Sequence, residues 1–246
     1  MKTGNYSYAS RLRNGQDMLA AIKEMVEYNP SRSQESIIGF STHLDQIVDT
    51  NSAETNLLKE YSFLVDERQK VFFLNDDSLD KKFLSIKNAV MSQYGKKSQE
   101  VKVLKRIHNR MQFNKVSNTT NSVPTENENA EESVDTIQNK TVNHAEKTFG
   151  SMAKNLSDFV TMISGFNSYQ PGIEELKLEN LQTYLSYIKS LNDGVAEKKT
   201  KLTNIKHLRK EQYNELKDRG DRIKFYIKSK YGANSNEYKQ VRSILL

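Results

Sequence analysis

Apolar side chains recur every three or four residues along most of this chain, which is the spacing that places them on one face of an α-helix. One such stretch runs from Tyr8 to Tyr28, and another runs from Phe149 to Phe166. Sustained alternation of apolar and polar residues does not occur, and no hairpin dipeptide joins two β-branched runs. The pattern therefore predicts an all-α fold.

Pro30 and Pro171 follow these two stretches and predict turns, because proline disfavours helix at the preceding residue and fits the first turn of the next helix. Second helices are expected over about 33–50 and 173–191. Short polar side chains compete for backbone hydrogen bonds, so we expect breaks where they cluster, at Asn51-Ser52 and at Asn192-Asp193-Gly194.

The chain also contains an internal repeat, which is the sequence feature with most bearing on architecture. Tyr94-Gly95-Lys96-Lys97-Ser98-Gln99-Glu100-Val101-Lys102 returns as Tyr231-Gly232-Ala233-Asn234-Ser235-Asn236-Glu237-Tyr238-Lys239. Pro30 and Pro171 are equivalent at an offset of 141 residues, whereas Tyr94 and Tyr231 are equivalent at an offset of 137. The first copy is therefore expected to carry about one extra helical turn of chain around 74–82, as a longer connection.

Each repeated residue has a structural interpretation. Gly95 and Gly232 are expected to end helices in the left-handed conformation, and Ser98 and Ser235 to cap a last short helix. The tyrosines before the glycines, Tyr94 and Tyr231, are expected to close the end of a bundle. Arg68 and Arg209 are equivalent too. We expect their stems to pack at a bundle boundary, with an anion-binding cleft as the alternative.

These elements predict two tandem up-down bundles of about four helices, each with a short C-terminal helix. The first bundle is expected over 1–113 and the second, as a repeat of the first, over 146–246. Between them, 114–145 is polar and poor in apolar residues, so we expect a flexible linker. In a competing arrangement, the two copies share their helices in one larger bundle.

The repeated segment fits the pattern Tyr/Phe-Gly-x-x-Ser-x-Glu-Tyr/Phe. The second copy matches it throughout, from Tyr231 to Tyr238, whereas Val101 departs from it at the last position of the first copy. On this motif the chain resembles a group of uncharacterised bacterial tandem helical-bundle proteins. The resemblance implies a helical bundle and implies no activity.

The formal net charge is +6, and the excess is concentrated between Lys198 and Lys230, which hold 12 basic and 4 acidic residues. Such a segment suits binding to nucleic acid or another polyanion, since its charges release counterions. The candidate residues are Lys198, Lys199, Lys201, Arg209 and Lys210. The alternative is a solvated outer face over an aromatic core, and the corresponding part of the first copy lacks the same excess.

No catalytic, cofactor-binding or metal-binding residue is predicted. The chain has no cysteine, which excludes disulfides and thiolate chemistry, and none of its four histidines follows a glutamate by three residues, as di-iron bundles require. A nucleophile turn of the form Gly-x-Ser-x-Gly is absent from the sequence.

We therefore expect a non-enzymatic helical-repeat interaction or scaffold protein with a protein partner. Two similar units on one chain would raise the effective concentration at a second site. The alternative function is nucleic-acid or polyanion binding through the basic face of the second bundle. The absence of a long apolar run and of a signal-like N-terminus predicts no membrane insertion and a cytoplasmic location. The oligomeric state is left open.

Overall fold

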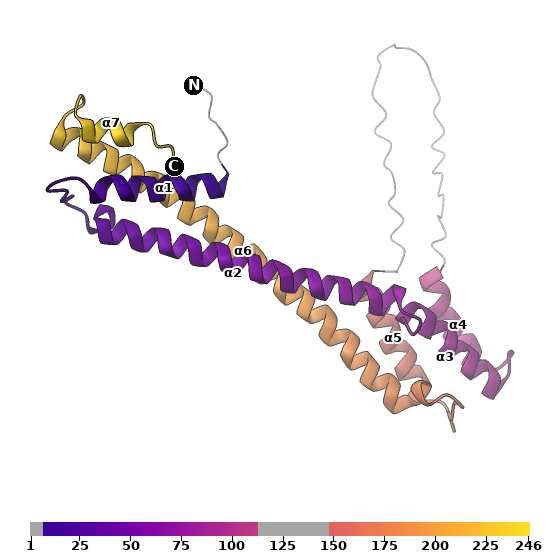
Figure 1. Cartoon of the computed structure of the whole chain (residues 1–246). Coiled ribbons are helices and arrows are strands. Elements are labelled where there is room, and N and C mark those ends of the chain that lie inside the picture. The colour runs from indigo at the N-terminus through magenta and orange to yellow at the C-terminus, as the bar shows by residue number, and fades with distance from the viewer. Residues whose placement is uncertain (1–6, 113–147) are drawn as a thin grey trace, which may run out of the picture. The chain divides into compact units, whose positions relative to one another are not determined.

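A computed structural model describes residues 7–112 and 148–246, and these residues form helices joined by turns, with no strand among them (Figure 1). This confirms the all-α prediction for the described part of the chain. The expected linker over 114–145 lies outside the described residues. The longer helices are α1 (Tyr8–Lys23), α2 (Ile37–Gln69), α3 (Leu79–Tyr94), α4 (Gln99–Gln112), α5 (Phe149–Ser164) and α6 (Leu178–Tyr231); α7 (Asn236–Arg242) is short.

The breaks expected at Asn51 and Asn192 do not occur, and this prediction is wrong. Helix α2 continues for 33 residues and α6 for 54. The two asparagine side chains bond to other helices and so do not compete for their own backbone. The amide of Asn51 donates to the hydroxyl of Tyr213 at 3.0 Å, and that of Asn192 donates to the carbonyl of Phe149 at 3.3 Å.

The longer connection expected in the first copy is present. A π-helical turn (η2, Lys70–Leu74) ends α2, and a bend then leads to α3 at Leu79. At the equivalent place in the second copy, α6 continues without interruption. Phe72 and Leu79 are fully buried on the two sides of this connection, so the extra residues are accommodated without opening the core.

The described helices form two compact units, and these do not follow the expected division at 113 and 146. Unit 1 contains residues up to Leu64 together with Val195–Leu246, and unit 2 contains Val65–Gly194. Each unit therefore takes helices from both sequence copies. The physical reason is the continuity of α2 and α6, because each helix begins in one unit and supplies residues to the other.

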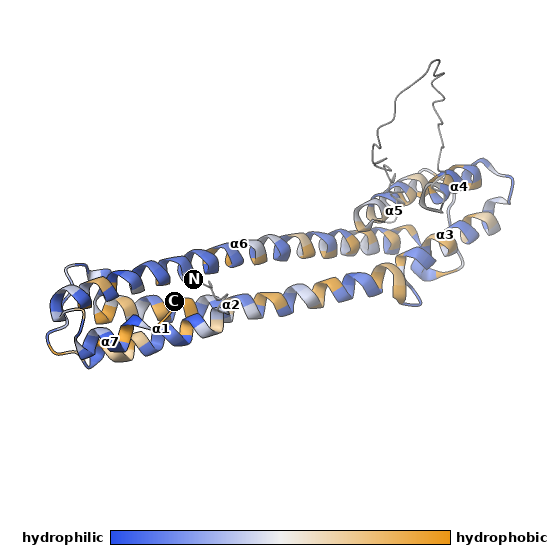
Figure 2. Cartoon of the chain, turned by 90° about the horizontal axis from the view of Figure 1, so that it is seen from above, coloured by the Kyte–Doolittle hydropathy of each residue, from blue (hydrophilic) through white to orange (hydrophobic). Residues whose placement is uncertain are grey.

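Each apolar core likewise contains residues from both sequence copies. In unit 1, Phe40 and Ile47 of the first copy share a core with Ile223 of the second copy. In unit 2, Phe83 of the first copy packs against Phe159 of the second, with ring centroids 5.1 Å apart. Along both α2 and α6, hydrophobic and hydrophilic residues recur over the length of the helix (Figure 2).

Helix ends follow the local sequence closely. Gly95 and Gly232 have φ angles of 84° and 97°, and they follow the last residues of α3 and α6. The hydroxyl of Ser98 accepts from the backbone N–H of Val101, and that of Ser235 accepts from the N–H of Tyr238. The predicted helix stops and N-caps are present. Of the described helices, none is long and apolar enough to cross a membrane.

Candidate functional site

Tyr94 and Tyr231 make matching contacts in the two units. Each hydroxyl donates to a backbone carbonyl 2.7 Å away, Tyr94 to Asn167 and Tyr231 to Val26. The two acceptors, Val26 and Asn167, are equivalent at the repeat offset of 141 residues. Tyr94 of the first copy therefore closes a turn of the second copy, and Tyr231 of the second copy closes the equivalent turn of the first. Burial, and then the charge of Glu100, raises the pKa of Tyr94.

The turns that carry Pro30 and Pro171 also match. The hydroxyl of Tyr28 donates to the carbonyl of Glu35, and that of Tyr169 donates to the carbonyl of Leu176, in both cases across a short 3₁₀ turn (η1, Ser33–Glu35; η3, Glu174–Leu176). Burial, followed by the nearby Tyr94, raises the pKa of Tyr169 to about 12. Both hydroxyls therefore stay protonated at neutral pH and act as donors.

Arg68 and Arg209 lie over aromatic rings at equivalent positions. The guanidinium carbon of Arg68 is 3.9 Å from the ring centroid of Phe149, and that of Arg209 is 4.5 Å from the ring centroid of Tyr8. Arg209 is also ion-paired with Glu54, which is buried. These contacts favour a packing role over an anion-binding cleft.

The predicted polyanion-binding residues fall into two groups. Lys198 is paired with Glu60, Lys201 with Glu197 and Arg209 with Glu54, and these partners already neutralise the charges. Lys199 and Lys210 are exposed, and neither lies within ion-pair distance of an acidic group in the described part of the chain. The structure thus leaves two of the five candidate residues open to solvent and unpaired.

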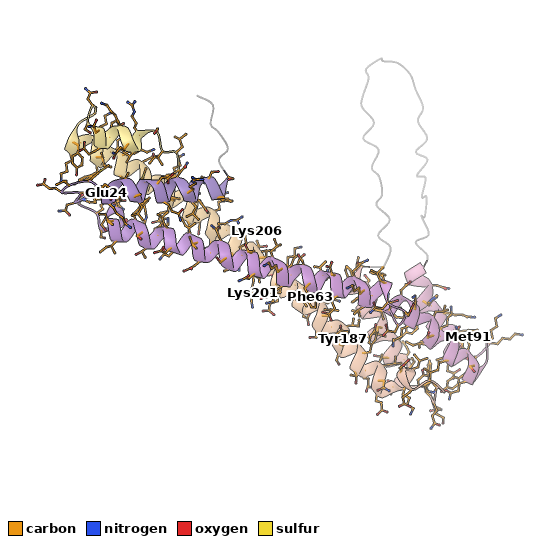
Figure 3. All side chains as sticks on the ribbon, in the orientation of Figure 1. Glu24, Phe63, Met91, Tyr187, Lys201 and Lys206 are labelled. Carbon is orange, nitrogen blue, oxygen red and sulfur yellow. The ribbon has the colours of Figure 1, made fainter. Side chains whose placement is uncertain are left out.

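Lys206 and Lys217 extend this open group. With Lys199 and Lys210 they follow spacings of seven, four and seven residues, which place all four on one face of α6. All four are exposed, and Lys206 is labelled in Figure 3. The sequence could have shown this stripe through its spacing, but it could not show which lysines are ion-paired.

Unit 1 also contains a buried polar network that sequence analysis missed. Arg219 donates to Glu215 and to the carbonyls of Gln34 and Gly39, and both carbonyl distances are 3.1 Å. His43 lies beside this network, bonded to the carbonyl of Gln212. Burial, and then the positive charge of Arg219, lowers the pKa of His43. The Nε, Nη1 and Nη2 groups of Arg219 thus all have acceptors within unit 1.

No cluster of three or more His, Cys, Asp or Glu residues suited to a metal ion occurs among residues 7–112 and 148–246.

A groove of about 590 Å³ lies in unit 2, between α3 and the turn at Pro171. Its lining is uncharged: Ser85, Asn88, Ala89, Ser92 and Gln93 from α3, and Gln170, Pro171, Gly172 and Ile173 from the turn. Met91 marks the position of α3 in Figure 3. A groove with an apolar floor and a few amide and hydroxyl groups at its edge is suited to holding a side chain or a short segment.

The corresponding surface of unit 1 is covered by the chain's own side chains. Tyr226 stands where unit 2 has Ala89, and its ring contacts Tyr28. Arg222 stands where unit 2 has Ser85, and it donates to the buried Glu35 at 2.6 Å. The two units therefore differ in whether this surface is closed or open.

No family model, curated protein or solved structure matches this chain. The groove of unit 2 and the lysine stripe of α6 are two candidate sites that its own geometry provides.

Proposed function

We propose that this protein is a non-enzymatic interaction protein built by internal duplication, and that unit 2 binds a segment of a protein partner in the groove beside Pro171. The observation that carries the proposal is the difference between the two copies. Matched contacts at Tyr28 and Tyr169, and at Tyr94 and Tyr231, support a common architecture, whereas the surface that Tyr226 covers in unit 1 is an open groove in unit 2.

The substitutions between the copies support a binding role. In unit 1, Glu35 and Arg222 form a pair across the surface, and in unit 2 their places are taken by Leu176 and Ser85. Leu176 is buried within its core, so it leaves the surface uncovered. Small and polar residues of α3 then form one wall of a groove that is accessible to a partner.

A photo-crosslinking residue placed at Ser92, inside the groove, tests this proposal in native cells. Ser229 is the matched control, because it is the equivalent residue of unit 1 and is also exposed. We expect a discrete protein adduct from position 92 and none from position 229. No adduct at position 92, or the same adduct at both positions, would contradict the proposal.

Polyanion binding through α6 is the second candidate function, favoured by the four exposed lysines Lys199, Lys206, Lys210 and Lys217 on one helical face. Their first and last members are about 27 Å apart along a helix that rises 1.5 Å per residue, which is several phosphate spacings of a nucleic acid. Lys198, Lys201 and Arg209 contribute less to this proposal because they are already paired.

Charge reversal distinguishes this candidate. Lys199→Glu with Lys210→Glu is expected to weaken binding to duplex DNA about tenfold or more at low salt and to reduce its salt dependence. Lys59→Glu with Lys239→Glu makes the same change in net charge at two other exposed residues of unit 1 and should have a smaller effect. DNA binding that is absent, independent of salt or equally sensitive to both pairs disproves polyanion binding by this face.

A further inference from the structure

In unit 1, an aromatic side chain of the chain itself covers the turn before Pro30. The ring of Tyr226 meets the ring of Tyr28 edge to face, with centroids 5.4 Å apart and planes at 89°. Its hydroxyl accepts a hydrogen bond from the backbone N–H of Asn29 at 3.1 Å. A tyrosine thus supplies both the apolar cover of this turn and the acceptor for its exposed N–H.

In unit 2, the receiving surface is retained, but the ring is missing. Tyr169 occupies the place of Tyr28 with the same hydrogen bond to its 3₁₀ turn, and Ala89 occupies the place of Tyr226. The N–H of Gln170 corresponds to that of Asn29, and here it is satisfied by the side-chain oxygen of Gln93 at 3.0 Å. The side chain of Ala89 ends at its Cβ, where Tyr226 carries a phenol ring.

The groove has the chemistry that a phenol needs. Pro171 is buried at its floor, Ala89 is half-buried, and Ile173 is an exposed apolar side chain at its edge. Asn88 and Ser92 are exposed on the same wall and can bond to a hydroxyl group. The volume of about 590 Å³ is ample for one aromatic ring and the backbone that carries it.

We propose that the groove of unit 2 receives a tyrosine side chain from a partner segment, seated where Tyr226 sits in unit 1. This deepens the proposed function and rests on it, because it names the partner's recognition group. The incoming ring packs edge to face against Tyr169 and covers Pro171, and its hydroxyl bonds to the polar wall formed by Asn88 and Ser92. Aromatic contacts of this geometry add to the free energy of burial and so favour a ring over an aliphatic side chain.

The probe for this proposal is p-cresol, the side-chain analogue of tyrosine, titrated into the full chain and followed by amide NMR shifts. We expect saturable shifts at Ser92, Gly172 and Ile173, with a dissociation constant on the order of millimolar for so small a ligand. Ala89→Tyr fills the groove with the chain's own ring, and it should weaken p-cresol binding at least tenfold.

The reverse variant, Tyr226→Ala, keeps the proposal testable if Ala89→Tyr fails to fold. It opens the equivalent surface of unit 1, and we expect a second set of saturable p-cresol shifts at Asn29 and Ser31. The proposal is overturned if the wild-type chain shows no saturable shift at Gly172 and Ile173, or if Ala89→Tyr leaves those shifts unchanged.

The two proposals fail separately. An adduct from position 92 without p-cresol binding would mean that the groove holds a partner through a group other than tyrosine. Binding of p-cresol without an adduct from position 92 would mean that the groove accepts a ring while the proposed interaction function is wrong.

Discussion

Each unit contains helices from both halves of the sequence, so we predict that neither half folds alone as a monomer. We consider a split chain, with residues 1–112 and 148–246 produced together as separate polypeptides. Each unit takes its core from both halves, so the two polypeptides are expected to form a stable 1:1 complex. Two tandem bundles would instead give two independent folded monomers.

The expected cost of separation follows from the core of unit 1. The second half supplies five side chains that are completely buried in this unit: Tyr213, Leu216, Ile223, Ile227 and Val241. Burial of each contributes about 2 kcal/mol, so their loss removes on the order of 10 kcal/mol. This is comparable with the whole free energy of unfolding of a typical domain, so residues 1–112 as a monomer would lose their cooperative fold.

Affinity purification through a tag on one half, followed by light scattering and urea unfolding, measures this outcome. Equivalent residues of the two halves make equivalent contacts, as Tyr94 and Tyr231 do. Either half by itself is therefore also expected to form a dimer with a second copy of itself. The reasoning is refuted if residues 1–112 alone behave as a monomer with cooperative unfolding.

A pair of variants checks that the core causes the association. Ile223→Asp places a charge in the fully buried core of unit 1 and should abolish or strongly weaken formation of the 1:1 complex. Asn214→Asp introduces the same side chain at an exposed position of the same helix and should leave the complex intact.

Three further variants test the packing and the electrostatics of unit 1, and a fourth, in unit 2, is a control. An added Cβ at Gly39 would clash with the carbonyl oxygen of Ser33, so Gly39→Ala should lower the free energy of unfolding by about 1–3 kcal/mol in urea denaturation. Gly150 has open space around its Cα, so Gly150→Ala should be neutral or slightly stabilising in the same assay. The lowered pKa of His43 means that the unfolded chain takes up a proton near pH 6.5 that the folded chain does not, so stability falls as the pH drops below about 7. His43→Gln should lose less stability than the wild type between pH 7 and 5, and an equal loss would contradict this. Glu54→Gln leaves Arg209 without its buried charge partner and should cost about 1–3 kcal/mol in the same urea assay.

Some features of this fold could be predicted because local chemistry decides them. The helices that end before Gly95 and Gly232 do so because these residues take a positive φ angle that other side chains rarely adopt. Ser98 and Ser235 cap the next helices through hydrogen bonds that reach only three residues along the chain.

Other features depended on partners far away in the sequence. Asn51 looked like a helix break until its amide proved to bond to Tyr213. Similarly, Lys198 and Lys199 are adjacent and chemically alike in the sequence, yet only Lys198 has an acidic neighbour, Glu60 on another helix. The groove also depends on one such difference, because Ala89 and Tyr226 can be compared only once both are placed beside equivalent turns.

The amino-acid sequence by itself determined that this protein is helical, that its motifs recur, and where most of its helices stop, since backbone propensity and capping act within a few residues. The tertiary structure alone decided which helices share a core and which charges and surfaces stay open. Those outcomes depend on contacts between the two sequence copies, and the repeat makes several pairings equally compatible with the local pattern.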